Sequence, residues 1–146
     1  MIGIIMGSKS DLEIMKEATE ILDKLGAAYE MEIASAHRNP EKVSAFARSA
    51  SQKYKCIIAG AGKAAHLPGV IAGQTTLPVI GVPIKTSDLG GLDSLLSIVQ
   101  MPKGVPVATV AINGAQNAGI LAAQICALTD ARLAQAVAAY KESLKA

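Results

Sequence analysis

Aromatic residues are scarce in this chain, which has no tryptophan, one phenylalanine and three tyrosines among 146 residues. Proteins that bind a flavin usually stack its ring on aromatic side chains, because the flat faces pack well against each other. The composition therefore disfavours a flavin-dependent electron carrier.

Charged residues are also few, at 18% of the chain against roughly 25% in an average domain. The 14 lysines and arginines are dispersed among 12 acidic residues, and the net charge is only +2. A surface that tracks nucleic-acid phosphates needs clustered basic residues, so we expect no nucleic-acid partner.

Hydrophobic residues make up 51% of the chain. This is more apolar surface than one small domain readily buries, so the composition predicts a homo-oligomer.

The chain has two cysteines, Cys56 and Cys126, each inside an apolar run and neither in a Cys-x-x-Cys pair. We expect both to be buried, reduced thiols.

No apolar segment reaches the roughly 18 residues that a membrane helix needs. Residues 1–6 lack the basic start and long apolar stretch of a secretory signal. These absences predict a cytoplasmic protein with no membrane association.

Short β-branched segments alternate with helical patterns along the whole chain, which is typical of βαβ units around a parallel sheet. The length suits one domain, residues 1–146. We therefore predict an α/β fold with strands near residues 2–6, 28–34, 55–60, 77–81 and 106–111.

Two helices are predicted in the first half of the chain. The first begins at Ser10, which has capping-box spacing to Glu13, and ends at Gly26. The second begins with Asn39 as N-cap and Pro40 at the first helical position. Apolar side chains should face inward from both: Leu12, Met15, Ile21, Leu22 and Leu25 in the first, and Val43, Phe46 and Ala47 in the second.

Two further helical patterns lie near the C-terminus. An alanine-rich one, from Gly114 to about Leu128, is apolar nearly all round, which predicts burial, either within the subunit or against another. Thr129 or Asp130 caps an amphipathic one whose apolar positions are Leu133, Val137, Tyr140 and Leu144. Residues 85–91 have turn chemistry and two glycines, so they form either a mobile flap or a plain surface loop.

Polar, glycine-rich segments follow three of the predicted strands, at residues 7–11, 35–40 and 60–69. The carboxyl ends of parallel strands meet at one edge of the sheet, where ligands bind. We therefore expect the three segments to converge on one place that recognises a phosphate and moves a proton.

The first segment is Gly7-Ser8-Lys9-Ser10-Asp11. A turn at a helix N-terminus offers backbone amides, hydroxyls and the positive end of the helix dipole to a phosphate. Ser8 and Ser10 are equally consistent with a turn residue and a helix cap. The Asp11 carboxylate cannot hold phosphate, but it can accept hydrogen bonds from ribose hydroxyls. The spacing of a Walker loop is absent.

The second and third segments carry both histidines of the chain. Arg38, beside Ser35, has the forked donor geometry that suits phosphate oxygens, although a surface ion pair would also explain it. His37 is the side chain best suited to exchange a proton near neutral pH, unless it is a core or capping histidine. His66 is as consistent with a structural role as with a chemical one. No cluster has metal-ligand spacing, so we expect metal-free catalysis.

Five segments, in order over almost the whole chain, resemble the PurE family, the N5-carboxyaminoimidazole ribonucleotide mutases of de novo purine synthesis. They are residues 7–11, 35–40, 59–69, 77–83 and 93–102. The resemblance implies a three-layer α/β/α sandwich with a parallel, flavodoxin-like sheet, assembled as a homo-octamer with active sites between subunits. It also implies transfer of a carboxylate from the exocyclic nitrogen of an aminoimidazole ribonucleotide to ring carbon C4, without metal, biotin or nucleoside triphosphate.

The resemblance also implies roles for individual residues. His37 is implied to be catalytic, and Lys63 stands where the family leads us to expect an uncharged residue. Lys63 either contacts the substrate carboxylate or points outward. The remaining implied substrate-binding residues are Ser8, Ser10, Asp11, Ser35 and Arg38 around the ribose phosphate, and Gly62, Ala64 and His66 around the imidazole and its carboxylate.

Three other readings are open to test. Within the family, a carboxylase would use free aminoimidazole ribonucleotide and carbon dioxide, although residues 64–69 favour the mutase. A flavodoxin-like carrier or a response regulator shares the alternation of strands and helices, but a receiver domain needs an acidic cluster where Gly7-Ser8-Lys9 stands. A purely structural oligomer is disfavoured by the three converging polar segments.

Overall fold

Five parallel strands form the centre of the computed structural model, which describes residues 1–146. Their order in the sheet is β2-β1-β3-β4-β5, and the expected α/β fold is confirmed. The strands are β1 (Ile2–Met6), β2 (Tyr29–Ile33), β3 (Cys56–Gly62), β4 (Val79–Ile84) and β5 (Ala108–Thr109).

The predicted strands all form, but their ends differ from the prediction. β3 and β4 extend further toward their carboxyl ends than residues 60 and 81. β5 is much shorter than the predicted 106–111. It lies at the edge of the sheet, and Pro106 beside it has no N–H to donate to a ladder.

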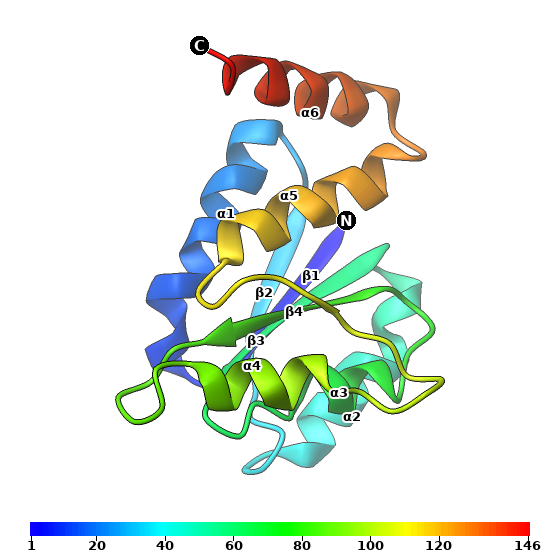
Figure 1. The fold of residues 1–146 in the computed structure, drawn as a ribbon. Coiled ribbons are helices and arrows are strands. Elements are labelled where there is room, and N and C mark those ends of the chain that lie inside the picture. Colours follow the sequence, from blue (N-terminus) through cyan, green and yellow to red (C-terminus); the bar gives the residue numbers. More distant parts are fainter.

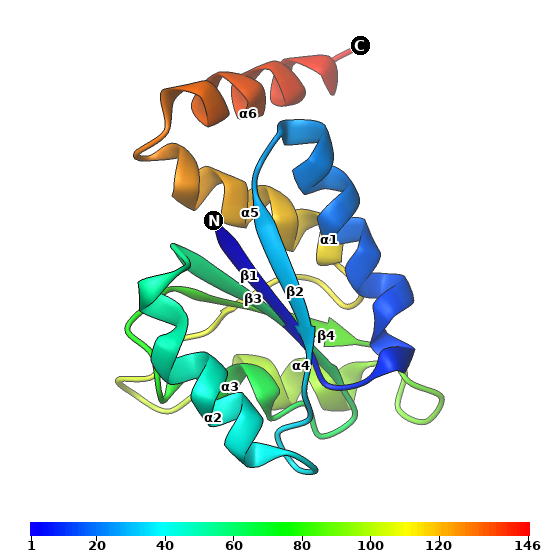
Figure 2. The ribbon, with the colours of Figure 1, turned by 180° about the vertical axis from the view of Figure 1, so that it is seen from behind.

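Helices cover both faces of the sheet, so the molecule has the three layers that the resemblance implied (Figures 1 and 2). α1 and α5 lie on one face with α6 outside them, and α2, α3 and α4 lie on the other. The helices are α1 (Leu12–Leu25), α2 (Pro40–Ser49), α3 (Leu67–Ala72), α4 (Leu92–Val99), α5 (Ala115–Ala127) and α6 (Ala131–Ser143). Short 3-10 turns span Lys9–Asp11 and Ala50–Gln52. None of these helices combines the length and the apolar character needed to traverse a bilayer.

The core has two halves because successive strand residues point to opposite faces. Ile4 and Ile58 belong to the cluster that packs with α1, α5 and α6. Ile5 and Ile57, their neighbours in sequence, belong to the cluster with α2 and α3. β1 and β4 are buried on both faces, as is usual inside parallel sheets, whereas the edge strands β2 and β5 are partly exposed.

The N-cap predicted at Ser10 is wrong. Ser8 is the cap: it is extended, its Oγ accepts a hydrogen bond from the Ser10 N–H, and the Asp11 carboxylate accepts one from the Ser8 N–H. The capping box therefore sits two residues earlier and opens a 3-10 turn that leads into α1. The predicted end at Gly26 is confirmed, with φ of 70°.

The other helix predictions are confirmed in part. Asn39 caps α2, with Pro40 at its start, and the predicted inward-facing residues of α2 are buried. Asp130, not Thr129, caps α6 by accepting from the Leu133 N–H. Leu144, predicted on the apolar face, lies beyond the end of α6 and is 64% exposed.

α5 is buried along one face within the subunit, and burial of its other face against another subunit stays a prediction. The cysteines also differ from each other: Cys56 is buried as expected, whereas Cys126 is only half-buried. Burial raises the pKa of the Cys56 thiol to about 12, which keeps it protonated and unreactive.

The register of the sheet aligns the strand ends that matter for the site. Met6 pairs with Ile33 on one side and with Gly60 on the other, and Gly60 pairs with Val82. The segments that follow β1, β2, β3 and β4 therefore leave the sheet at nearly the same height.

Candidate active site

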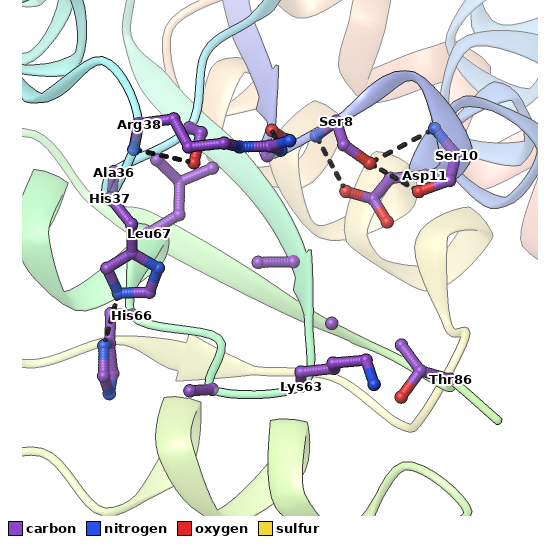
Figure 3. A pocket seen from close by; sticks show the side chains of 15 residues that line it. Ser8, Ser10, Asp11, Ala36, His37, Arg38, Lys63, His66, Leu67 and Thr86 are labelled. Carbon is purple, nitrogen blue, oxygen red and sulfur yellow. Dashed lines mark hydrogen bonds between the residues drawn. The ribbon is translucent and has the colours of Figure 1, made fainter. Parts of the chain in front are cut away.

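A cavity of about 500 Å³ lies at this carboxyl edge of the sheet (Figure 3). Its walls come from the segments after β1, β2, β3 and β4. The structure brings together all nine site residues predicted from the sequence: Ser8, Ser10, Asp11, Ser35, His37, Arg38, Gly62, Ala64 and His66.

The first wall is the capping turn before α1. The Ser8 and Ser10 hydroxyls hydrogen-bond to each other, and the Ser8 N–H donates to Asp11 Oδ2 over 3.0 Å. Both hydroxyls border the cavity and can rotate, so they can turn to a ligand oxygen. The turn presents hydroxyl donors at the positive end of α1, an arrangement that suits an anion.

Asp11 is the one buried carboxylate of the site, at 7% exposure. Burial raises the pKa of this carboxyl, while the hydrogen bonds from Ser8 and the positive charge of Arg38 act in the opposite direction. Since Oδ2 accepts from the Ser8 N–H, Oδ1 is free to accept from a ligand hydroxyl.

Arg38 spans the gap between the second and first segments. Its backbone N–H donates to Ser35 Oγ over 3.2 Å, and its Nη2 donates to the Gly7 carbonyl over 3.3 Å. Figure 3 shows the guanidinium extended toward Ser8. Arg38 forms no ion pair in the structure, so the surface ion pair considered above is wrong.

The two histidines are in direct contact across the cavity wall. His37 Nε2 and His66 Nδ1 are 2.8 Å apart, and the rings meet edge to face with centroids 4.9 Å apart. His66 precedes α3 but makes no side-chain cap to it, and both rings are exposed. Neither is a core or capping histidine. Either nitrogen can be the donor of this hydrogen bond, so the pair offers a path for a proton between the two rings.

The third wall is the end of β3 and the turn after it. A Cβ added to Gly62 would lie 2.6 Å from Thr86 Cγ2 and 3.2 Å from the Ile84 carbonyl oxygen, so only glycine fits. Ala64 and Ala61 add little bulk, which lets a ligand approach the backbone closely. Lys63 follows Gly62 with φ of 54°, a conformation that favours glycine.

Thr86 lines the cavity and was not among the predicted site residues. It stands two residues after β4, at the same edge of the sheet as the other segments. Polar segments at the carboxyl ends of the predicted strands supplied the predicted site residues. Thr86 was missed because β4 was predicted to end at residue 81, whereas it ends at Ile84. No group of three or more histidines, cysteines and acidic residues is placed to hold a metal ion.

The family model described as AIR carboxylase matches residues 1–146, the whole chain. The chain belongs to the AIR carboxylase family. Family membership agrees with the resemblance seen in the sequence.

Relatives in the AIR carboxylase family carry two kinds of name. The N5-carboxyaminoimidazole ribonucleotide mutase of Thermotoga maritima is 60% identical over 99% of this chain and 85% of its own length. The phosphoribosylaminoimidazole carboxylase of Schizosaccharomyces pombe is 56% identical over 99% of this chain, but the match covers only 26% of that protein. The crystal structure of Treponema denticola PurE superposes with a TM-score of 0.89 at 30% identity, covering 99% of this chain and 90% of that one.

Proposed function

We propose that this member of the AIR carboxylase family is an N5-carboxyaminoimidazole ribonucleotide mutase of purine biosynthesis, an isomerase. The observation that carries the proposal is the meeting of the His37–His66 pair, Arg38 and the serine turn in one cavity. A phosphate-binding group and a proton-transferring group then face the same ligand. The mutase of Thermotoga maritima, matched over 85% of its own length, supports the same activity.

The nucleotide phosphate is held by the turn before α1 and by the Arg38 guanidinium. Ser8, Ser10 and Ser35 supply hydroxyl donors, and Arg38 supplies a forked pair of N–H donors to two phosphate oxygens. The free oxygen of Asp11 accepts from a ribose hydroxyl, which fixes the sugar between the phosphate and the base. These contacts orient the aminoimidazole toward His37.

The chemistry breaks the bond between the exocyclic nitrogen and the carboxyl carbon and forms a bond from ring carbon C4 to that carbon. Decarboxylation first releases carbon dioxide and aminoimidazole ribonucleotide within the cavity. His37 gives a proton to the nitrogen as its bond to the carboxyl carbon breaks. C4 then attacks the carbon dioxide, and His37 takes the proton that C4 loses, so that proton and carboxylate exchange places and the atoms balance.

The narrow wall formed by Gly62 and Ala64 suits this sequence of steps. Small residues let the aminoimidazole ring approach the backbone closely, which leaves little room for water beside the released gas. His66 holds the His37 ring through the Nε2–Nδ1 contact and so fixes its direction.

A second candidate is carboxylation of free aminoimidazole ribonucleotide by dissolved carbon dioxide. The relative in Schizosaccharomyces pombe, which is named a carboxylase, favours it, although the matched region is a quarter of that protein. Both reactions share the second half of the proposed mechanism, so the same residues serve both.

One assay separates the two candidates. The purified protein is given N5-carboxyaminoimidazole ribonucleotide, or free aminoimidazole ribonucleotide, in buffer depleted of bicarbonate. A mutase converts the first to the C4-carboxylated product and leaves the second unchanged. Conversion of the free nucleotide alone, and only when bicarbonate is restored, would instead favour the carboxylase.

We also propose that the chain assembles into a homo-octamer. An apolar stripe runs along the outer face of α4 and the loop before it, through Leu89, Leu92, Leu96 and Val99, which are 66%, 55%, 49% and 45% exposed. This pattern, together with the half-exposed outer face of α5, supports burial against other subunits.

A further inference from the structure

Lys63 places a positive charge on the cavity wall, on the side away from Arg38 (Figure 3). Its ammonium pairs with the Asp88 carboxylate in the segment after β4. This ion pair lowers the pKa of Asp88 and raises that of Lys63, with Asp93 adding to the latter effect, so both partners are charged at neutral pH.

The ion pair with Asp88 is a weak reason for a lysine at this position. The side chains of Lys63 and Asp88 are 62% and 64% exposed, and ion pairs in water contribute little to stability. Lys63 also adopts a positive φ, which costs free energy for any residue with a Cβ. An exposed pair of this kind exchanges readily for another anion.

Thr86 gives an independent indication of a polar ligand group at this wall. Its Oγ1 is buried and has no hydrogen-bond partner, although Thr86 lines the cavity. Buried hydroxyls nearly always have a partner, since a lost hydrogen bond is costly. Figure 3 shows the Lys63 side chain pointing toward Thr86, so an ammonium and a hydroxyl donor lie at the same part of the cavity wall.

The proposed substrate offers two anionic groups, a phosphate and a carboxylate. The guanidinium of Arg38 and the serine hydroxyls already serve the phosphate on the far side of the cavity. Lys63 and Thr86 therefore match the second anionic group, the carboxylate.

We propose that Lys63 and Thr86 form a carboxylate-binding pair that selects the carboxylated nucleotide over the free one. Lys63 exchanges Asp88 for the substrate carboxylate, and the Thr86 hydroxyl donates a hydrogen bond to the same group. The proposal rests on the mutase function and adds to it a source of specificity.

Calorimetric titration with two nucleotides tests the proposal: 4-carboxy-5-aminoimidazole ribonucleotide and 5-aminoimidazole ribonucleotide, which lacks the carboxylate. Lys63→Met should weaken binding of the first by about tenfold or more, the effect of losing a hydrogen bond to a charged group, and leave the second unchanged. Thr86→Val should weaken binding of the carboxylated nucleotide only. Thr86→Ser keeps the hydroxyl and should keep the affinity of the unaltered protein. Asp88→Asn frees Lys63 and should strengthen binding of the first.

Two variants serve as controls. Lys63→Gly suits the positive φ, so it folds and should show the same selective loss as Lys63→Met. Lys85→Met removes an exposed charge from the segment that holds Thr86 and Asp88. Lys85 does not line the cavity, so both affinities should stay unchanged. If Lys63→Met and Lys63→Gly leave the ratio of the two affinities as in the unaltered protein, the pair does not recognise the carboxylate. Equal weakening of both nucleotides would place Lys63 at the phosphate and would also overturn the proposal.

Failure of the mutase function gives a different result. In that case the unaltered protein itself does not convert N5-carboxyaminoimidazole ribonucleotide. An unaltered protein that turns over substrate, beside variants with an unchanged affinity ratio, rejects only the role of Lys63 and Thr86.

Discussion

His37 and Arg38 are adjacent in sequence, yet their side chains serve opposite parts of the cavity. Arg38 extends back to the Gly7 carbonyl at the end of β1, while His37 meets His66 at the start of α3. One short segment thus links the group proposed to hold the phosphate to the group proposed to move the proton. The two functions should be separable by single substitutions.

His37→Asn should reduce turnover by about 100-fold or more, the usual contribution of a general acid–base group, with little change in nucleotide affinity. Arg38→Ala should instead weaken nucleotide binding, because it removes the charged donors to the phosphate. Steady-state kinetics and calorimetry on both variants check this division. Near-normal turnover by His37→Asn would reject its catalytic role, and unchanged binding by Arg38→Ala would remove Arg38 from the phosphate site.

Asp11→Asn should raise the free energy of unfolding at pH 7. Burial raises the pKa of the Asp11 carboxyl above its ordinary value of 3.8, so the fold disfavours the charged form that predominates at pH 7. This cost arises as the pH climbs through the raised pKa, and it vanishes well below pH 3.8, where the carboxyl is neutral in both states. Urea titrations at pH 7 and at acid pH measure the difference.

The exposed Glu17→Gln is the matched control for loss of one carboxylate and should have little effect. A less stable Asp11→Asn protein at pH 7 would mean that the hydrogen bond from Ser8 outweighs the cost of burial. The same substitution should weaken nucleotide binding, because an amide oxygen is a poorer acceptor than a carboxylate. Greater stability together with weaker nucleotide binding would show that the Asp11 carboxylate is kept for the ligand, at a cost to the stability of the fold.

At the scale of elements, close packing of α1 on α5 supports the turn that begins the site. Gly119 of α5 faces α1, and a Cβ there would lie 2.5 Å from Ile21 Cγ2 and 2.9 Å from the Ala18 carbonyl oxygen. The backbone oxygen cannot move aside without displacing α1. A shift of α1 would move the capping turn at its start, and Ser8 and Asp11 with it.

Gly119→Ala should therefore destabilise the protein by about 1–3 kcal/mol, the usual cost of overpacking a core. Chemical denaturation measures the loss. Asn117→Ala, at an exposed position of the same helix, should change stability by less than about 0.5 kcal/mol. Equal stability of Gly119→Ala and the unaltered protein would show that α1 and α5 can separate without cost.

Sequence predicted the elements and the meeting of their ends better than it predicted local details. The alternation of strands and helices predicted the parallel sheet, and the strand-end rule predicted that the three segments meet. The nine residues, some of them named only through the family resemblance, lie on those segments and line one cavity. The cap was misplaced because Ser8 and Ser10 have similar spacing to an acidic residue, and only the backbone selects between them. The contact between His37 and His66, 29 residues apart, depends on the packing of two separate loops, which no local pattern encodes.

At the scale of the whole molecule, the stripe on α4 and the loop before it carries four of the nine large apolar side chains that the single chain leaves exposed. Leu92→Glu combined with Leu96→Glu should reduce the assembly to smaller species, because burying two carboxylates in an apolar interface is costly. Sedimentation velocity measures the mass of the unaltered protein and of the variant. Lys16→Glu, exposed on α1, is the control for added negative charge. An unchanged octamer in the double variant would place the interface elsewhere.

The alignment of the ends of β1, β2 and β3 also has a consequence for the loss of activity on heating. Met6, Ile33 and Gly60 lie on one rung of the ladder, and the Ala34 N–H donates to the Met6 carbonyl while the Gly7 N–H donates to that of Gly60. Main-chain bonds thus hold the starts of the three cavity-lining loops together. We therefore expect fraying of α6 on warming to leave the site assembled, and heat inactivation to accompany rupture of the central ladder itself.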